Sequence, residues 1–98
     1  EAIGLFRRAI EADPANAEAL LYLAGALASS GRPAEALPFF ERSLRADPAS
    51  TMAWNGLALT RLGLGDRAGA AKAFRESLRL DPDQPDVVRA LAGLGRAG

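Results

Sequence analysis

The stretch that decides the fold runs from Trp54 to Pro82 and reads WNGLALTRLGLGDRAGAAKAFRESLRLDP. It holds three landmarks, which are Trp54-x-x-Leu57-Ala58, Ala70-x-x-x-Phe74 and Asp81-Pro82. The same slots are filled 34 residues earlier by Leu20-x-x-Leu23-Ala24, Ala36-x-x-x-Phe40 and Asp47-Pro48. Partial copies flank these two units, as Ala2-x-x-x-Phe6 with Asp13-Pro14 on one side and Val88-x-x-Leu91-Ala92 on the other. The chain is therefore a tandem array of one repeated unit.

These landmarks and their spacing resemble those of the tetratricopeptide repeat (TPR) family, whose unit is a helix–turn–helix of 34 residues. The resemblance covers essentially all 98 residues. It implies an all-α fold, namely a TPR-type right-handed superhelix of antiparallel helix pairs with six helices. Each pair would bury its apolar face against its neighbours, as stacked repeats do.

We expect a single TPR domain over residues 1–98. It divides into a half repeat, a repeat, a second repeat and a terminal half repeat, at residues 1–16, 17–50, 51–84 and 85–98. The chain begins with Glu1, without a methionine and midway through a unit. We interpret it as a fragment of a longer protein.

Turn residues predict where the helices begin and end. The expected helices cover residues 1–12, 17–30, 33–46, 51–63, 67–80 and 85–95. The Asp-Pro steps separate the units because the residue before a proline avoids the helical region. Gly31 and Gly65 can close helices in the left-handed conformation. Asn16, Ser50 and Asp66 are placed to cap the helices that follow them.

Close helix packing predicts a small residue opposite a large one in each pair. Ala24 is expected to face Phe40, and Ala58 to face Phe74, with Trp54 buried alongside. One slot departs from the family pattern, which expects an aromatic residue near the end of each first helix: it holds Leu27, an ordinary apolar substitute, then Arg61 and then Gly95. Arg61 can lay its methylene stem on the core while its guanidinium reaches water. Gly95 suggests that the last helix frays.

The composition excludes several classes of function. Lys plus Arg equals Asp plus Glu at 12 each. That balance argues against a partner of the nucleic-acid or anionic-membrane class, which needs a basic surplus. There is no Cys and no His. The usual zinc sites, thiolate chemistry and imidazole bases are therefore excluded, and no metal or cofactor is expected. No apolar run approaches the roughly 20 residues that span a bilayer.

Enzyme-like motifs fail on their context, so we do not expect an enzyme. Gly93-x-Gly95-x-x-Gly98 matches a dinucleotide fingerprint in letters, but a helix precedes it where a strand is needed. The aspartates of the Asp-Pro steps lie in separate, equivalent turns, which favours a turn-forming role. The serines have no base to activate them.

Arginines gather on the second helix of each unit, with glutamates between them. A solvated face with ion pairs is the favoured interpretation, and a phosphate-binding stripe is the alternative. The arginines in question are Arg7, Arg8, Arg42, Arg45, Arg75 and Arg79.

The resemblance also implies a binding surface, because the first helix of each TPR unit lines the concave face where partners commonly bind. Off the packing stripe, these helices vary from unit to unit while the landmarks repeat. The candidate groove residues are Leu21, Met52, Asn55, Leu59 and Arg89. Asn55 is expected to hold peptide backbone and Arg89 an acidic group, beside a partly apolar wall. That the apolar residues merely pack against neighbouring units stays open.

We therefore expect a protein–protein interaction module, a scaffold or adaptor that binds a peptide or protein segment in the concave groove. The alternatives are an accessory or regulatory domain of a larger enzyme and a structural spacer. Weak self-association through exposed end helices is also expected. A cytoplasmic location is favoured over a periplasmic one, which stays open because a native N-terminus is thought to be missing.

Overall fold

The computed structural model describes residues 2–97, with side chains as far as Gly95. Within that range the chain forms six α-helices and no strand. They are α1 (Ala2–Ala12), α2 (Ala17–Ser29), α3 (Pro33–Ala46), α4 (Thr51–Gly63), α5 (Arg67–Leu80) and α6 (Pro85–Ala97). The predicted all-α fold with six helices is confirmed. The expected fraying at Gly95 is not seen, since α6 continues through that residue, and Gly98 lies outside the described residues.

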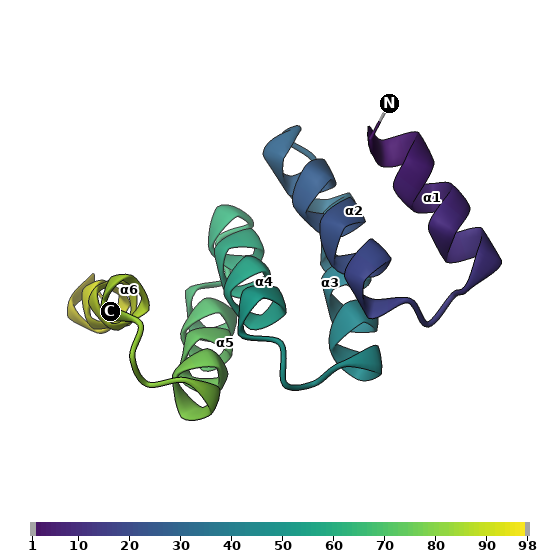
Figure 1. The fold of residues 1–98 in the computed structure, drawn as a ribbon. Helices are drawn as coiled ribbons and strands as arrows, with labels where there is room; N and C mark the ends of the chain where they lie inside the picture. Colours follow the sequence, from purple (N-terminus) through teal and green to yellow (C-terminus); the bar gives the residue numbers. More distant parts are fainter. Residues whose placement is uncertain (1, 98) are drawn as a thin grey trace.

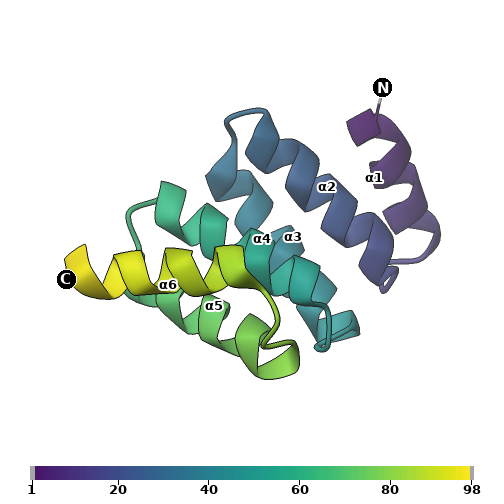
Figure 2. The same cartoon turned by 60° about the vertical axis from the view of Figure 1, so that its left-hand side comes forward.

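The helices stack in chain order from α1 at one end to α6 at the other (Figure 1). α2 packs antiparallel on α3, and α4 packs antiparallel on α5, while α3 contacts α4 and α5 contacts α6. Seen after the turn of Figure 2, α6 lies across α5. The stack measures 43 × 26 × 17 Å. None of the described helices is both long and apolar enough to cross a membrane.

The turn inside each pair closes on a glycine. Gly31 has φ 78° and Gly65 has φ 85°, the left-handed conformation that side chains disfavour. The next residue then reaches back across the turn, with Arg32 N–H donating to the Leu27 carbonyl at 2.9 Å. Asp66 N–H donates to the Arg61 carbonyl in the same way at 2.8 Å. This pattern satisfies carbonyls that the helix end would leave unpaired.

The turn between successive pairs is built on an aspartate. Oδ1 of Asp13, Asp47 and Asp81 each accepts a hydrogen bond from the backbone N–H two residues later. The turn-forming role predicted for these residues is confirmed. The predicted caps are confirmed too: the side chains of Asn16, Ser50 and Asp66 accept bonds from the first turns of α2, α4 and α5.

One apolar core runs through the whole stack, from Ile10 in α1 to Val87 in α6. Within the complete pairs, the small residues Ala24 and Ala58 are fully buried, and Phe40 and Phe74 are 3% and 2% exposed. The prediction for Trp54 is wrong in part, because this side chain is only half-buried. Its indole Nε1 donates to the Pro48 carbonyl at 3.0 Å, so the ring lies at the rim of the core over the preceding turn.

Arg61 serves as a connector between three helices, a role that its sequence position did not reveal. Its Nη1 donates to the Gly69 carbonyl in the first turn of α5 at 3.2 Å, and its Nη2 lies 3.9 Å from Glu41 of α3. The expectation that its guanidinium simply reaches water is therefore corrected. A carbonyl at the start of α5 is within its reach because α5 folds back along α4.

The buried aromatic slot supplies a test of the core. Phe74→Ala should lower the free energy of unfolding by about 3–5 kcal/mol, because it removes a fully buried ring and leaves a cavity. Phe6 fills the same slot in α1 but is only half-buried, so Phe6→Ala should cost clearly less. Urea unfolding followed by circular dichroism measures both. Equal losses would contradict a core centred on the complete pairs.

Candidate functional site

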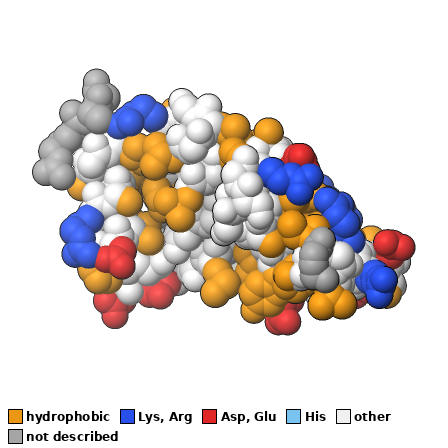
Figure 3. Space-filling model, turned by 90° about the horizontal axis from the view of Figure 1, so that it is seen from above, with side chains coloured by type: hydrophobic (Ala, Val, Ile, Leu, Met, Phe, Trp, Pro, Cys, Tyr) orange, Lys and Arg blue, Asp and Glu red, His pale blue; other side chains and the backbone are white. Residues whose placement is uncertain are grey.

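The largest exposed apolar side chains near the middle of the stack lie on the first helices of the pairs. Met52 and Leu59 of α4 are 62% and 60% exposed, and Tyr22 of α2 is 45% exposed. Hydrophobic side chains also reach the surface in separate patches along the molecule when it is viewed from above (Figure 3). An exposed apolar patch that borders a hollow is more informative than scattered residues of this kind.

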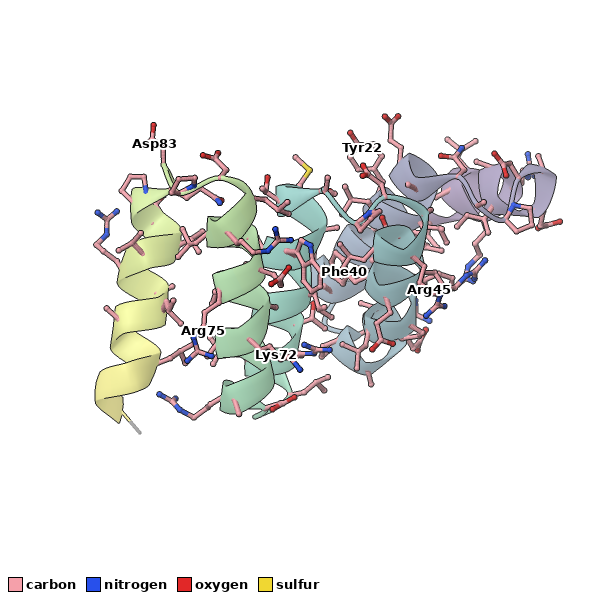
Figure 4. The ribbon with its side chains drawn as sticks, turned by 90° about the horizontal axis from the view of Figure 1, so that it is seen from below. Tyr22, Phe40, Arg45, Lys72, Arg75 and Asp83 are labelled. Carbon is pink, nitrogen blue, oxygen red and sulfur yellow. The ribbon has the colours of Figure 1, made fainter. Side chains whose placement is uncertain are left out.

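Two adjoining hollows lie between α2 and α4. One, of about 380 Å³, has Leu21, Tyr22 and Met52 in its wall. The other, of about 450 Å³, has Ala28 and Leu59 in its wall. Both are lined by Gly25, Ser29, Phe40 and Gly56. We call this continuous surface the α2–α4 groove. In Figure 4, Phe40 lies between the helices and Tyr22 lies nearer the edge.

Small residues create the floor of the groove. A Cβ atom on Gly56 would overlap the Phe40 ring, so the ring occupies the space that a side chain at Gly56 would take. A Cβ on Gly25 would meet nothing within 4 Å and would project into open space. One unit earlier, the slot of Gly56 holds Tyr22, whose ring lies 5.7 Å from that of Phe6. The two junctions thus differ, because Tyr22 packs beside Phe6 at the first and the Phe40 ring packs against Gly56 at the second.

Asn55 is engaged inside the protein. Its Nδ2 donates to Oε1 of Gln84 at 2.8 Å. The amide of Gln84 is oriented by carbonyls, because its Nε2 donates to the backbone oxygens of Ser77 and Asp81 at 3.1 and 2.8 Å. Oδ1 of Asn55 is buried and has no hydrogen-bond partner among the described residues. Asn55 therefore ties α4 to the turn before α6, and it lines neither hollow of the groove.

Arg89 lies on α6 and also lines neither hollow. Its guanidinium pairs with the Asp86 carboxylate on its own helix, and its side chain is 72% exposed. Three of the five residues singled out in the sequence, Leu21, Met52 and Leu59, therefore meet in one groove. The other two lie outside its two hollows.

Sequence reasoning missed the floor of the groove. Gly25 and Gly56 lie inside α2 and α4, where a glycine costs roughly 1 kcal/mol relative to alanine. That cost was the one available signal that a close approach or an opening lies at these positions. The contribution of Phe40 could not be seen, because its slot marks it as core and only the hollow above it brings it to the groove.

The arginine-bearing face is separate from the groove. Arg7 and Arg42 lie over the ring of Phe39, at 5.9 and 5.5 Å from its centroid. On α5, Arg79 makes a hydrogen-bonded ion pair with Glu76 at 2.9 Å, and that bond holds the pKa of the Glu76 carboxyl below its usual range. Arg45, Lys72 and Arg75 are labelled in Figure 4. Arg7, Arg42 and Arg79 are thus engaged by rings and acids of the same face, as is typical of a solvated surface.

The groove has few polar side chains in its lining. Its polar lining includes Ser29 and Thr60, and the Thr60 hydroxyl donates to the Gly56 carbonyl at 2.8 Å. Within the described residues, no group of three or more His, Cys, Asp or Glu side chains is placed to hold a metal ion.

Comparison with known families gives two matches. Family models described as "Tetratricopeptide repeat" match residues 1–51 and residues 51–84. No curated protein matches the chain.

Solved structures are similar over almost the whole chain. The first TPR domain of Spaghetti (RPAP3), solved bound to the HSP90 peptide SRMEEVD, is 21% identical with a TM-score of 0.93, and the match covers 97% of this chain and 75% of that one. MamA is 22% identical, with a TM-score of 0.91 and coverages of 97% and 56%. The Sgt2 TPR domain from Aspergillus fumigatus is 28% identical, with a TM-score of 0.88 and coverages of 97% and 64%. The chain thus spans less than two thirds of the last two, and these likenesses confirm the predicted superhelix.

Substituting the two glycines in the floor of the groove by alanine should change the free energy of unfolding in opposite directions. Gly56→Ala should lower the free energy of unfolding by about 1–2 kcal/mol, because overpacking against Phe40 outweighs the better helix propensity of alanine. Gly25→Ala meets open space and should raise it by up to about 1 kcal/mol. Urea unfolding of both variants measures this, and stabilisation by Gly56→Ala would refute the close approach.

Proposed function

The chain belongs to the tetratricopeptide repeat family, and we propose that its α2–α4 groove binds a segment of a partner protein. The family fold is a protein-interaction scaffold and is not typically catalytic. Within this chain the proposal assigns the binding to one surface, the groove floored by Gly25, Phe40 and Gly56.

One observation carries the proposal: large apolar side chains stand exposed on both sides of an open hollow. Met52 and Leu59 would bury most of their exposed surface against an inserted segment, at roughly 25 cal/mol for each Å² removed from water. The thioether of Met52 can adapt to side chains of different shape. Few polar groups lie in the groove, so an occupant is not required to carry a matching charge.

The five candidate residues take different parts in this proposal. Leu21 and Met52 flank one end of the groove, and Leu59 flanks the other. Arg89 lies on α6 outside the two hollows, where an acidic group of a longer partner segment would compete with Asp86 for its guanidinium. Asn55 acts as a positioning residue that holds the turn before α6 through Gln84, since its amide nitrogen is already engaged.

The similar structures support a peptide as occupant. The Spaghetti domain was solved with a bound HSP90 peptide, and YrrB, 24% identical here, is described as a TPR protein with an unusual peptide-binding site. The HSP90 peptide, SRMEEVD, is rich in acidic residues. The apolar walls of the groove in this chain favour a segment anchored by apolar side chains instead.

Two alternatives remain distinguishable from this proposal. A domain that regulates a neighbouring catalytic domain would use the groove, or another face, against its own chain. A spacer would have no occupant at all. The exposed apolar walls count against the spacer, which is better served by a polar surface.

Filling the groove should abolish binding without unfolding the domain. Peptides that bind the wild-type chain are selected from a random linear library displayed on phage, and their affinities are measured by fluorescence anisotropy. Gly25→Leu should weaken them by tenfold or more, because a leucine there projects into both hollows.

The matched control is Gly93→Leu. Gly93 holds the same slot of its unit on α6, with open space around it, and lines neither hollow of the groove. It should leave affinity within about twofold of wild type. If both variants, or neither, lost the selected peptides, the groove would not be their binding site.

Salt dependence tests the apolar character of the groove. Affinity for the selected peptides should change only modestly between low and high ionic strength, since the groove walls carry no charged side chain. The measurement is a titration of labelled peptide over a salt series. A steep loss of affinity would place binding on the arginine-bearing face instead.

A further inference from the structure

The floor of the α2–α4 groove lacks a ring that the preceding junction of the stack holds. At the first junction, Tyr22 of α2 packs beside Phe6 of α1, with the ring centroids 5.7 Å apart and the ring planes tilted by 33°. Shifted by 34 residues, the same two slots hold Gly56 and Phe40. The second junction therefore keeps one ring of the pair, and a glycine stands in the slot of the other.

The ring that remains lies where the side chain of residue 56 would begin. A Cβ atom on Gly56 would overlap Cε1 and Cζ of Phe40. Phe40 lines both hollows although only 3% of it is exposed, so it offers an occupant the edge of its ring and not the face. The edge of an aromatic ring carries partial positive charge and attracts the face of a second ring.

The walls of the groove also suit an aromatic occupant. On the α4 side, Met52 is 62% exposed, and its thioether makes favourable contacts with aromatic rings. On the α2 side, Tyr22 is 45% exposed, so part of its ring is open to a second ring. Neither hollow has a charged side chain in its lining, which is complementary to an uncharged anchor.

We infer that the partner segment is anchored by one aromatic side chain, whose ring lies against the edge of Phe40 between Met52 and Tyr22. This inference rests on the proposed function and adds the chemistry of the anchor. Gly25 leaves room for the ring, because a Cβ atom there would meet nothing within 4 Å. An aliphatic anchor would also be apolar, but it would lack the attraction of a ring face for the Phe40 edge.

Substitution of the anchor tests the inference. The probes are those phage-selected peptides whose binding is lost in the Gly25→Leu variant, so that only groove binders are compared. Each should carry an aromatic residue, and replacing that residue by leucine should weaken binding by about fivefold or more. Replacing a phenylalanine anchor by cyclohexylalanine, which is of similar size but not aromatic, should still weaken binding by about threefold.

The methyl group of Met52 reports where the ring lies. Met52 is the one methionine of the sequence, so a chain labelled with ¹³C at the methionine methyl group gives one resonance with an unambiguous assignment. The ring current of an aromatic anchor should shift this resonance when the peptide binds. The cyclohexylalanine peptide, measured at saturation, should shift it much less.

The outcomes separate this inference from the function on which it rests. Peptides that are lost in Gly25→Leu and retained in Gly93→Leu, but that bind equally well through an aliphatic anchor, would overturn the inference while the groove remains the binding site. An equal Met52 shift with the cyclohexylalanine peptide would overturn it in the same way. If no selected peptide responds to Gly25→Leu, the proposed function fails, and this inference fails with it.

Discussion

The close approach of the two helices in each pair is the constraint on which the rest of the structure depends. Ala24 and Ala58 on the first helices are fully buried, and Phe40 and Phe74 on the second helices are 3% and 2% exposed. Close-packed protein interiors tolerate little change in side-chain volume. The helices can vary in sequence on their other faces because these few slots, together with the turns, fix where each backbone lies.

The fold was predictable because its signals are local. Aspartates before prolines, glycines at helix ends and capping side chains act within a few residues, and the structure places each of them as expected. The site was less predictable because it depends on contacts between residues distant in sequence. The sequence predicts that Asn55 is free to bind a ligand, but in the structure its amide nitrogen donates to Gln84, which lies 29 residues later in the chain. The hollow over Phe40 depends in the same way on which residues face each other across α2, α3 and α4.

Variation between the repeat units did predict part of the groove. Met52 and Leu59 were singled out because their slots vary from unit to unit, and both are exposed at its edge. Arg61 shows the limit of that reasoning. A variable slot can also hold a residue that serves the fold, and the contacts of Arg61 with Glu41 and the Gly69 carbonyl link three helices.

A repeated backbone provides equivalent spaces at each junction, and the side chain in each slot determines whether the space is filled. At the first junction, the Tyr22 ring packs beside that of Phe6, whereas at the second the Phe40 ring packs directly against Gly56. Arg61 bridges α3 and α5, whereas Gly95 leaves a hollow beside α6. A smaller side chain at a fixed backbone position is therefore answered in one of two ways here: a neighbouring ring moves into the space, as Phe40 does at Gly56, or a hollow remains, as beside Gly95.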